Sequence, residues 1–310
     1  MSNQTSDNNK RIAKNTLFLY FRMLFMMAVS LYTSRIILKA LGVEDFGIYN
    51  VVGGFVTMFT YITGSMSTAT QRFITFALGK KDYVGLKKVF SMAISIHIGM
   101  AILLLIVGEI VGLWLLYNKM IIPEGRMNAA FWVLQCSLLS TVVMVISIPY
   151  NALIISHEKM SAFAYISILE VTLKLLLVFT LLVLPADKLI CYAIFLLCVQ
   201  VLLQFIYSIY SRRHFEESKY QRVWDKQLFK DMSSFAGWSM FGCLAGAGQT
   251  QGLNILLNVF FGPAVNAARG VAVQVQNAIN GFARNFQMSV NPQITKNYAS
   301  GELEYMNKLI

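Results

Sequence analysis

Apolar residues dominate the chain in runs long enough to cross a membrane. The hydrocarbon core of a bilayer is ~30 Å thick, which takes roughly 20 apolar residues in a helix. Runs of this length recur along the whole sequence, at about residues 16–41, 46–71, 89–117, 127–154, 161–184, 188–211, 232–261 and 264–292. The pattern predicts an all-α, polytopic membrane protein with about eight transmembrane helices.

One long polar stretch interrupts this pattern after the sixth run. Residues 211–232 are rich in Arg, Lys, Glu and Gln, and they separate six expected helices from two. We therefore expect an N-terminal lobe at residues 1–226, with helices one to six. The start of a C-terminal lobe, with helices seven and eight, is expected at residues 227–310.

The second lobe resembles the start of the first. Leu41-Gly42 matches Phe261-Gly262, and the segment ITFALGKKDY resembles ITKNYASGELEY further along the chain. Internal repeats in membrane proteins usually build two lobes around a site at the midplane. On this interpretation the second lobe stops after two of six helices, and we expect the sequence to be part of a protein with twelve or more spans. Chance similarity between amphipathic turns is the alternative.

The distribution of Lys and Arg predicts the orientation. Short loops rich in these residues stay in the cytoplasm. The two tails and the second, fourth and sixth loops carry most of the basic residues, and the opposite side has only Lys39, Lys119, Arg126 and Lys188. We therefore expect a multi-pass protein of the bacterial inner membrane, with both the N-terminus and the C-terminus in the cytoplasm.

Composition excludes several classes of function. Charged residues make up 13% of the chain and the mean hydropathy is +0.58, which does not suit a soluble domain. The net charge of +11 is scattered over separate short loops, so it reflects topology and anionic lipid rather than nucleic-acid binding. The four cysteines lie inside expected helices without a CxxC pair or a nearby His, so we expect no metal site and no cofactor.

Five basic residues fall inside the expected spans: Arg22, Arg35, Lys174, Arg269 and Arg284. A charge at the bilayer centre costs at least ~2.5 kcal/mol on the insertion scale, so each should face protein, water or a ligand. Arg35 lies near a helix end, where reaching the interface is an equally good explanation. Arg22 lies about seven residues inside the first helix, and we expect it to line a cavity.

The eighth run carries a continuous polar stripe. Its polar residues recur at steps of three, four and seven: Asn266, Arg269, Gln276, Asn280, Arg284, Gln287 and Asn291. Such a helix cannot face lipid, and two guanidinium groups ~22 Å apart favour a hydrated cavity over a packed interface. Because the planar fork of Arg binds phosphate oxygens in pairs, the intramembrane arginines indicate an anionic, phosphate-bearing cargo.

Three charged residues inside the spans are candidates for ion coupling: Glu109, Glu170 and Lys174. Glu170 and Lys174 are four residues apart on one helix, so they can pair and reduce each other's desolvation cost. A structural pair is the favoured interpretation of these two. Glu109 has no local basic partner; it can carry a coupling proton or accept an arginine from another helix.

No GxxxxGK[ST], HExxH or GxSxG motif is present. We therefore expect a transporter and not an enzyme, driven by an ion gradient, the membrane potential or the gradient of the cargo.

Several segments resemble the polysaccharide-exporter branch of the multidrug/oligosaccharidyl-lipid/polysaccharide flippase superfamily, the Wzx-like O-antigen flippases in particular. These segments are SRIILKALGVEDFGIYNVVGG, STATQRFITFALGK, IPYNALIISHEKMSAFAYISILEVTLKL and FAGWSMFG. The likeness runs along the whole chain, and its specificity rests on the order and spacing of loose apolar motifs.

The resemblance implies two six-helix lobes in a V around a central cavity that moves a lipid-linked (undecaprenyl-pyrophosphate) oligosaccharide outward for lipopolysaccharide or other surface polysaccharide. Relatives that flip the peptidoglycan precursor hold pyrophosphate with arginines of helices one, two and eight. Arg22, Arg72 and Arg269 are at similar positions here. With the stripe residues Arg284, Gln276 and Asn280 they form the expected substrate site. The expected partners are this oligosaccharide, membrane lipids, and a polysaccharide polymerase and glycosyltransferases.

A drug or cation antiporter of the same fold is the alternative. Such exporters need buried carboxylates to bind their cargo. The first two expected helices contain arginines and no intramembrane Asp or Glu, which favours the flippase. A membrane scaffold without transport activity is the third class, and it would not need the polar stripe of the eighth run.

Overall fold

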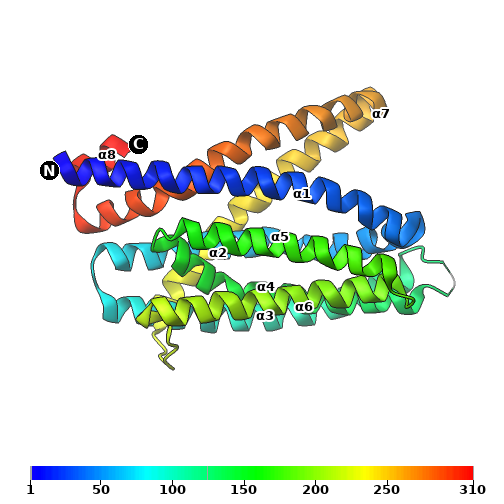
Figure 1. Cartoon of the computed structure of the whole chain (residues 1–310), viewed down its shortest axis with the longest axis horizontal. Helices are drawn as coiled ribbons and strands as arrows, with labels where there is room; N and C mark the ends of the chain where they lie inside the picture. Colours follow the sequence, from blue (N-terminus) through cyan, green and yellow to red (C-terminus); the bar gives the residue numbers. More distant parts are fainter. Residues whose placement is uncertain (1, 124, 310) are drawn as a thin grey trace.

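The computed structural model describes residues 2–123 and 125–309, apart from the side chains of residues 2–9, 61, 305, 309 and most of 247–274. All secondary structure in these residues is helical (Figure 1). The elements are α1 (Ser2–Thr57), α2 (Phe59–Gly79), α3 (Tyr83–Asn118), α4 (Met127–Ser156), α5 (Met160–Val183), α6 (Lys188–His214), the short 3₁₀ helix η1 (Glu216–Ser218), α7 (Lys226–Ser300) and α8 (Leu303–Leu309).

The all-α, polytopic fold expected from the sequence is confirmed. Within the described residues, α1, α3, α4, α5 and α6 are each long and apolar enough to cross a membrane. Inside such helices the backbone N–H and C=O groups pair with one another, as a hydrocarbon solvent requires. The membrane orientation stays a prediction, although both termini do lie at one end of the molecule (Figure 1). We call this the terminal end and the opposite one the far end.

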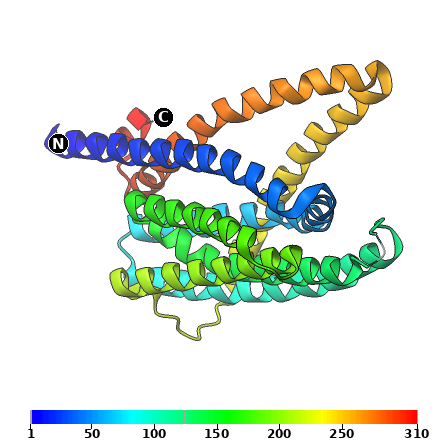
Figure 2. The same ribbon diagram turned by 45° about the vertical axis from the view of Figure 1, so that its right-hand side comes forward.

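The first two expected spans are joined differently from the expectation. α1 continues past residue 41 and bends at Gly42, whose φ of 79° and ψ of 172° only glycine adopts readily. The second expected span is then shared between the last part of α1 and α2. α7 likewise contains both the seventh and the eighth expected runs, because it runs out to the far end and returns (Figures 1 and 2). The division into two lobes and the internal repeat stay predictions.

Side-chain caps explain where several helices begin. Asp82, Asp187 and Asp225 each precede a helix and accept hydrogen bonds from backbone N–H groups of its first turn. These caps satisfy donors that the helix itself cannot pair. α7 ends at Gly301, whose φ of 82° gives the left-handed conformation that closes a helix C-terminus.

The apolar core lies among α2 to α6, around α4. Its largest fully buried side chains include Phe90 of α3, Leu134 and Leu153 of α4, Leu181 of α5 and Leu189 of α6. The polar stretch at residues 211–232, expected as a linker, packs on this core over its first half. Phe215 is buried with the His157 ring stacked on it at 4.1 Å, and the Gln221 N–H donates to Ser91 Oγ at 3.0 Å.

α7 contacts the rest of the molecule near the terminal end. Gly79 of α2 lies against α7 so closely that a Cβ there would be 2.6 Å from the Lys296 carbonyl oxygen, which only glycine allows. Further along α7, Trp238, Phe241 and Phe260 are 75%, 68% and 72% exposed. The described contact between α2 and α7 at Gly79 therefore lies near the terminal end.

An ion-pair cluster holds the far end of the N-terminal helices. Arg126, in the α3–α4 loop, donates to Asp45 Oδ1 at 2.8 Å and to Asp187 Oδ2 at 2.7 Å. The hydrogen bond with Asp45 raises the pKa of Arg126. The pKa of Asp187 is lowered, because the hydrogen bonds that it accepts from Arg126 and from two backbone N–H groups outweigh its partial burial. Arg126 thus ties the α1 kink to the start of α6.

Candidate functional site

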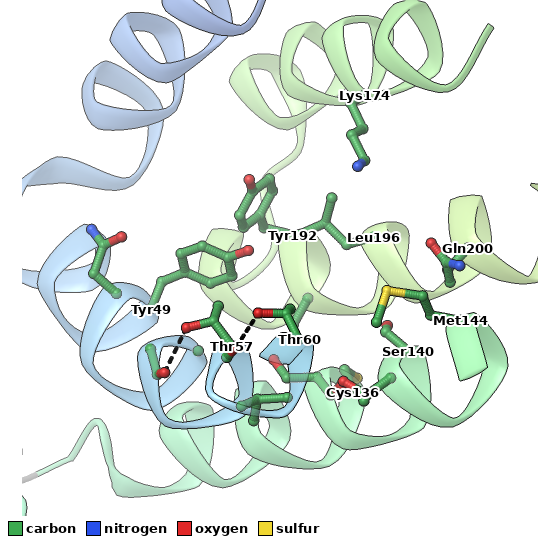
Figure 3. Close-up of a pocket in the computed structure, with 17 residues that line it drawn as sticks. Tyr49, Thr57, Thr60, Cys136, Ser140, Met144, Lys174, Tyr192, Leu196 and Gln200 are labelled. Atoms are coloured by element: carbon green, nitrogen blue, oxygen red, sulfur yellow. Dashed lines mark hydrogen bonds between the residues drawn. The ribbon is translucent and has the colours of Figure 1, made fainter. Parts of the chain in front are cut away.

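A pocket of about 560 Å³ lies among α1, α4, α5 and α6 (Figure 3). It begins just inside the far end, because Tyr49 follows Asp45 by one helical turn and Tyr192 follows Asp187 by little more than one. We call it the N-terminal pocket. Its lining is rich in hydroxyl and amide groups: Tyr49, Asn50, Thr57, Thr60, Ser137, Ser140, Thr141, Tyr192 and Gln200.

One side of the N-terminal pocket is an aromatic pair. The rings of Tyr49 and Tyr192 meet edge to face, with centroids 5.0 Å apart. Gly53 and Gly54 follow on the same helix, and neither has an atom within 4 Å of the place where a Cβ would be. The pocket therefore has a rigid aromatic wall beside an open stretch of backbone.

Three polar side chains of the pocket lack partners. Ser137, Ser140 and Gln200 make no side-chain hydrogen bond to any described residue. Thr57 donates to the Gly54 carbonyl of α1 at 2.7 Å, and Thr60, at the start of α2, donates to the Thr57 carbonyl at the end of α1 at 2.6 Å. Polar groups within a membrane protein are costly to leave unpaired, so this pocket is built to hold water or a polar ligand.

Among the described residues, Lys174 is the only charged one that lines the N-terminal pocket. Its side chain points from α5 into the pocket (Figure 3), and its Nζ donates to Glu170 Oε1 at 2.6 Å. The predicted Glu170–Lys174 pair is therefore present. The shared carboxylate reduces the cost of the ammonium group, and two of the three Nζ donors stay available.

Arg22 lies half-buried where α1, α5 and α7 meet. Its Nη2 donates to Asn285 Oδ1 at 3.1 Å and its Nη1 to Ser167 Oγ at 3.4 Å, while the guanidinium carbon is 4.4 Å from the centroid of the Phe163 ring. The buried Nε has no hydrogen-bond partner among the described residues. Arg22 thus contacts protein and polar groups, as the free-energy cost of placing a charge in lipid requires. Its Nε–H remains available to donate a hydrogen bond to a ligand.

The polar stripe predicted on the eighth run is divided between two environments. Gln276, Arg284, Gln287 and Asn291 are exposed, and Arg269 and Asn280 are half-buried. The side chain of Asn266 lies outside the described residues. The face of α7 that packs on α1 is a neighbouring one, with Asn285, Ser289 and Gln293 buried at steps of four.

Arg72 lies at a different place from Arg22. Its guanidinium carbon is 4.5 Å from the centroid of the Phe235 ring, in a groove of about 400 Å³ between α2 and the start of α7 that Asp231 and Trp238 also line. Arg22 contacts the returning part of α7 instead. The structure therefore does not gather these two predicted substrate arginines around one point.

Glu109 accepts a hydrogen bond from Gln135 Nε2 of α4 at 2.9 Å. The sequence predicts that Glu109 either carries a coupling proton or accepts an arginine from another helix. The partner in the structure is a neutral amide, so Glu109 is satisfied by a residue that sequence spacing did not single out.

A second buried polar cluster centres on Glu158, in the α4–α5 turn. Its side chain is only 2% exposed, and it pairs with Arg11 Nε at 2.9 Å and with Lys296 Nζ at 2.7 Å. Gln293 Nε2 donates to the same carboxylate at 3.0 Å, and Asn15 donates to the Glu158 backbone carbonyl at 3.4 Å. One buried carboxylate therefore joins α1, the α4–α5 turn and α7 at the terminal end. We call these residues the Glu158 cluster.

Glu158 has a constrained backbone conformation, and it also affects the pKa of Lys296. Its φ of 59° is a left-handed conformation that non-glycine residues adopt only where the surroundings impose it. Burial lowers the pKa of Lys296, and the attraction of Glu158 opposes that shift. Sequence reasoning missed this cluster because Glu158 lies in a loop, where a charge is unremarkable.

A further contact continues from the Glu158 cluster toward Arg22. The Ser289 hydroxyl of α7 donates to the Ile12 backbone carbonyl of α1 at 3.1 Å. Asn285, one turn earlier on α7, contacts Arg22, ten residues further along α1. α1 and α7 are thus linked by three successive polar contacts over the terminal half of α1.

The comparisons with known proteins decide the family. A family model described as "Polysaccharide biosynthesis protein" matches residues 12–297, nearly the whole chain. The chain belongs to the polysaccharide biosynthesis protein family. The resemblance noted from the sequence segments is therefore confirmed. No curated protein matches the sequence.

Solved structures similar to this family member are transporters. An outward-facing multidrug resistance MATE family transporter of the MOP superfamily has a TM-score of 0.79 at 13% identity, covering 96% of this chain and 67% of that one. The Vibrio cholerae MATE transporter VcmN in its bent form has a TM-score of 0.77 at 18% identity, covering 98% and 69%. A MOP superfamily transporter from Pyrococcus furiosus has a TM-score of 0.75 at 13% identity, covering 96% and 67%. At these identities the likeness shows the fold.

We expect Glu158→Gln to weaken the terminal end. The substitution keeps the shape of the side chain but leaves Arg11 and Lys296 without their counter-charge. Breaking a buried ion pair costs about 3–5 kcal/mol, and the half-exposed Arg11 places the effect near the low end. The measurement is the thermal unfolding midpoint of the purified protein in detergent.

Glu304→Gln is the matched control, because Glu304 also pairs with a lysine, Lys308, but is highly exposed. It should leave the midpoint unchanged. Equal midpoints for Glu158→Gln and the unsubstituted protein would contradict the role given to Glu158.

Proposed function

We propose that this family member is a flippase that moves a lipid-linked, undecaprenyl-pyrophosphate oligosaccharide across the bacterial inner membrane for the synthesis of O-antigen or another surface polysaccharide. The observation that carries the proposal is the family match over residues 12–297, combined with the fold of a MOP superfamily transporter. A transporter fold in a polysaccharide-synthesis family accounts for both findings.

The charges inside the membrane support this cargo. The buried Nε of Arg22 is a donor in reserve, and a guanidinium suits pyrophosphate because it stays charged and binds two oxygens at once. Arg269, Arg284, Gln276 and Asn280 lie on the arm of α7 that contacts Arg22 through Asn285. Arg72 is the least direct candidate, since its groove lies between α2 and the start of α7.

The antiporter alternative rests on the MATE transporters among the similar folds. A site for a cationic drug needs a free carboxylate. Within the part of the chain that the structure describes, no carboxylate lines the N-terminal pocket, and Glu170 beside it is already paired with Lys174. The lining therefore favours a polar, uncharged or anionic cargo over a cation.

The Glu158 cluster fits an alternating-access cycle. In the proposed cycle this state is closed at the terminal end, and the cargo enters from there after the contacts of α1 and the α4–α5 turn with α7 separate. Charged contacts suit such a closure because water can solvate them when they part, which an apolar seal would not allow at so small a cost.

Arg22→Ala should reduce export by more than about tenfold, since a hydrogen bond to a charged group is worth ~1.5–3 kcal/mol. Arg22→Lys should restore only part of it, because a point charge lacks the paired geometry. Arg269→Ala should resemble Arg22→Ala. The measurement is lipid-linked oligosaccharide retained in the inner leaflet together with loss of surface polysaccharide, normalised to the amount of protein in the membrane.

Arg35→Ala is the matched control, because Arg35 is an exposed arginine on the same helix nearer the far end. It should export normally. Export at the unsubstituted rate by both Arg22→Ala and Arg269→Ala would remove the argument for an anionic cargo and favour the antiporter.

Cysteine labelling tests the proposed orientation, with both termini in the cytoplasm. Ile121, in the α3–α4 loop, is fully exposed and belongs to the far end. In a background without native cysteines, Ile121→Cys should react with an impermeant thiol reagent in intact cells. Lys219→Cys, exposed beside the buried Ser218, should react only after lysis. Labelling of residue 219 in intact cells would reverse the orientation.

A further inference from the structure

The N-terminal pocket has the chemistry of a carbohydrate site. A sugar offers hydroxyl groups that both donate and accept hydrogen bonds, and flat C–H faces that pack on aromatic rings. The pocket offers unpartnered Ser137, Ser140 and Gln200 for the first and the Tyr49–Tyr192 wall for the second. Its volume of about 560 Å³ is within the ~300–1,000 Å³ typical of small-molecule sites.

Other occupants suit the pocket less well. An acyl chain would leave its hydroxyl and amide groups unpaired, at a cost for each. A metal ion needs a cluster of acidic, His or Cys ligands, and the described residues contain none. An organic cation would find no carboxylate to pair with among the described lining residues.

We propose that the N-terminal pocket binds a sugar residue of the cargo, a subsite separate from the arginines that hold its pyrophosphate. The proposal rests on the flippase function in that the sugar belongs to the transported glycan. The ring lies against the Tyr49–Tyr192 wall, while Gln200 and Ser140 hydrogen-bond to its hydroxyl groups. Gly53 and Gly54 let the sugar approach the helix backbone.

Lys174 has a defined part in this subsite. The Glu170 carboxylate fixes the position of its Nζ at 2.6 Å and offsets its charge, so the ammonium acts mainly as an oriented donor to sugar oxygens. Arg22 contacts the same helix, through Ser167 Oγ at 3.4 Å and the centroid of the Phe163 ring at 4.4 Å. The glycan and the pyrophosphate are therefore bound at two places that one helix, α5, connects.

The test is saturation-transfer NMR of the purified full chain in detergent, with the neutral disaccharide N,N′-diacetylchitobiose as probe. The unsubstituted protein should transfer magnetisation to the sugar-ring protons. Gly54→Leu puts a side chain into the pocket and should reduce that transfer by about tenfold, which corresponds to ~1.4 kcal/mol of binding. Gln200→Ala should also reduce it, and this truncation breaks no hydrogen bond of the folded chain.

Gly99→Leu is the matched control. Gly99 of α3 also has no atom near the position of its Cβ, but it does not line the pocket, so its sugar signal should equal that of the unsubstituted protein. The proposal is overturned if the unsubstituted protein transfers no magnetisation to the disaccharide. It is also overturned if Gly54→Leu and Gln200→Ala, at unchanged thermal midpoints, bind as Gly99→Leu does.

A second measurement separates this proposal from the flippase function. If the subsite is wrong and the function right, Gly54→Leu exports surface polysaccharide normally. If the flippase function is wrong but the subsite is right, the disaccharide still binds and Gly54→Leu still reduces its binding. Deleting the gene then leaves the amounts of lipid-linked oligosaccharide and surface polysaccharide unchanged. Displacement of the disaccharide by tetraphenylphosphonium, an organic cation, would assign the pocket to a cationic cargo and overturn the sugar proposal.

Discussion

The closed terminal end depends on one buried carboxylate. Glu158 is held between Arg11 of α1 and Lys296 of α7, with Gln293 completing its hydrogen bonds. An isolated charge buried this deeply would be strongly unfavourable, so Arg11, Lys296 and Gln293 stabilise the carboxylate as long as the three segments lie together. The close approach of α2 and α7 at Gly79, and the Ser289 and Asn285 contacts with α1, all lie at this same end.

The far end is organised by a different ion pair, which gives the two ends different freedom. Arg126 joins Asp45 and Asp187, all within the first six helices, and leaves α7 out. On α7, the described Phe260 side chain is 72% exposed. Among the described residues, Arg126 therefore joins the N-terminal helices to one another at the far end, and Glu158 joins them to α7 at the terminal end.

Much of the fold followed from the sequence, because a hydrocarbon solvent admits long apolar helices and little else. The side-chain geometry followed less well. Helical spacing predicts a polar stripe through Arg284. The face of α7 that packs on α1 passes instead through Asn285, the next residue, which lies 100° further around the helix axis. Spacing finds a polar face without showing its partner, and Glu158 depends on chain segments more than 130 residues apart.

The most direct test of the account is a reversible lock across the closed end. Ile12→Cys and Ser289→Cys place one thiol on each helix at adjoining turns of α1 and α7, because the Ser289 hydroxyl donates to the Ile12 backbone carbonyl oxygen at 3.1 Å. In cells that depend on this protein, oxidation should cross-link α1 to α7 and stop export of surface polysaccharide, and a reductant should restore it. Each single-cysteine variant should be unaffected by either treatment. Undiminished export by the fully cross-linked protein would contradict the account, because the terminal end would then not need to open.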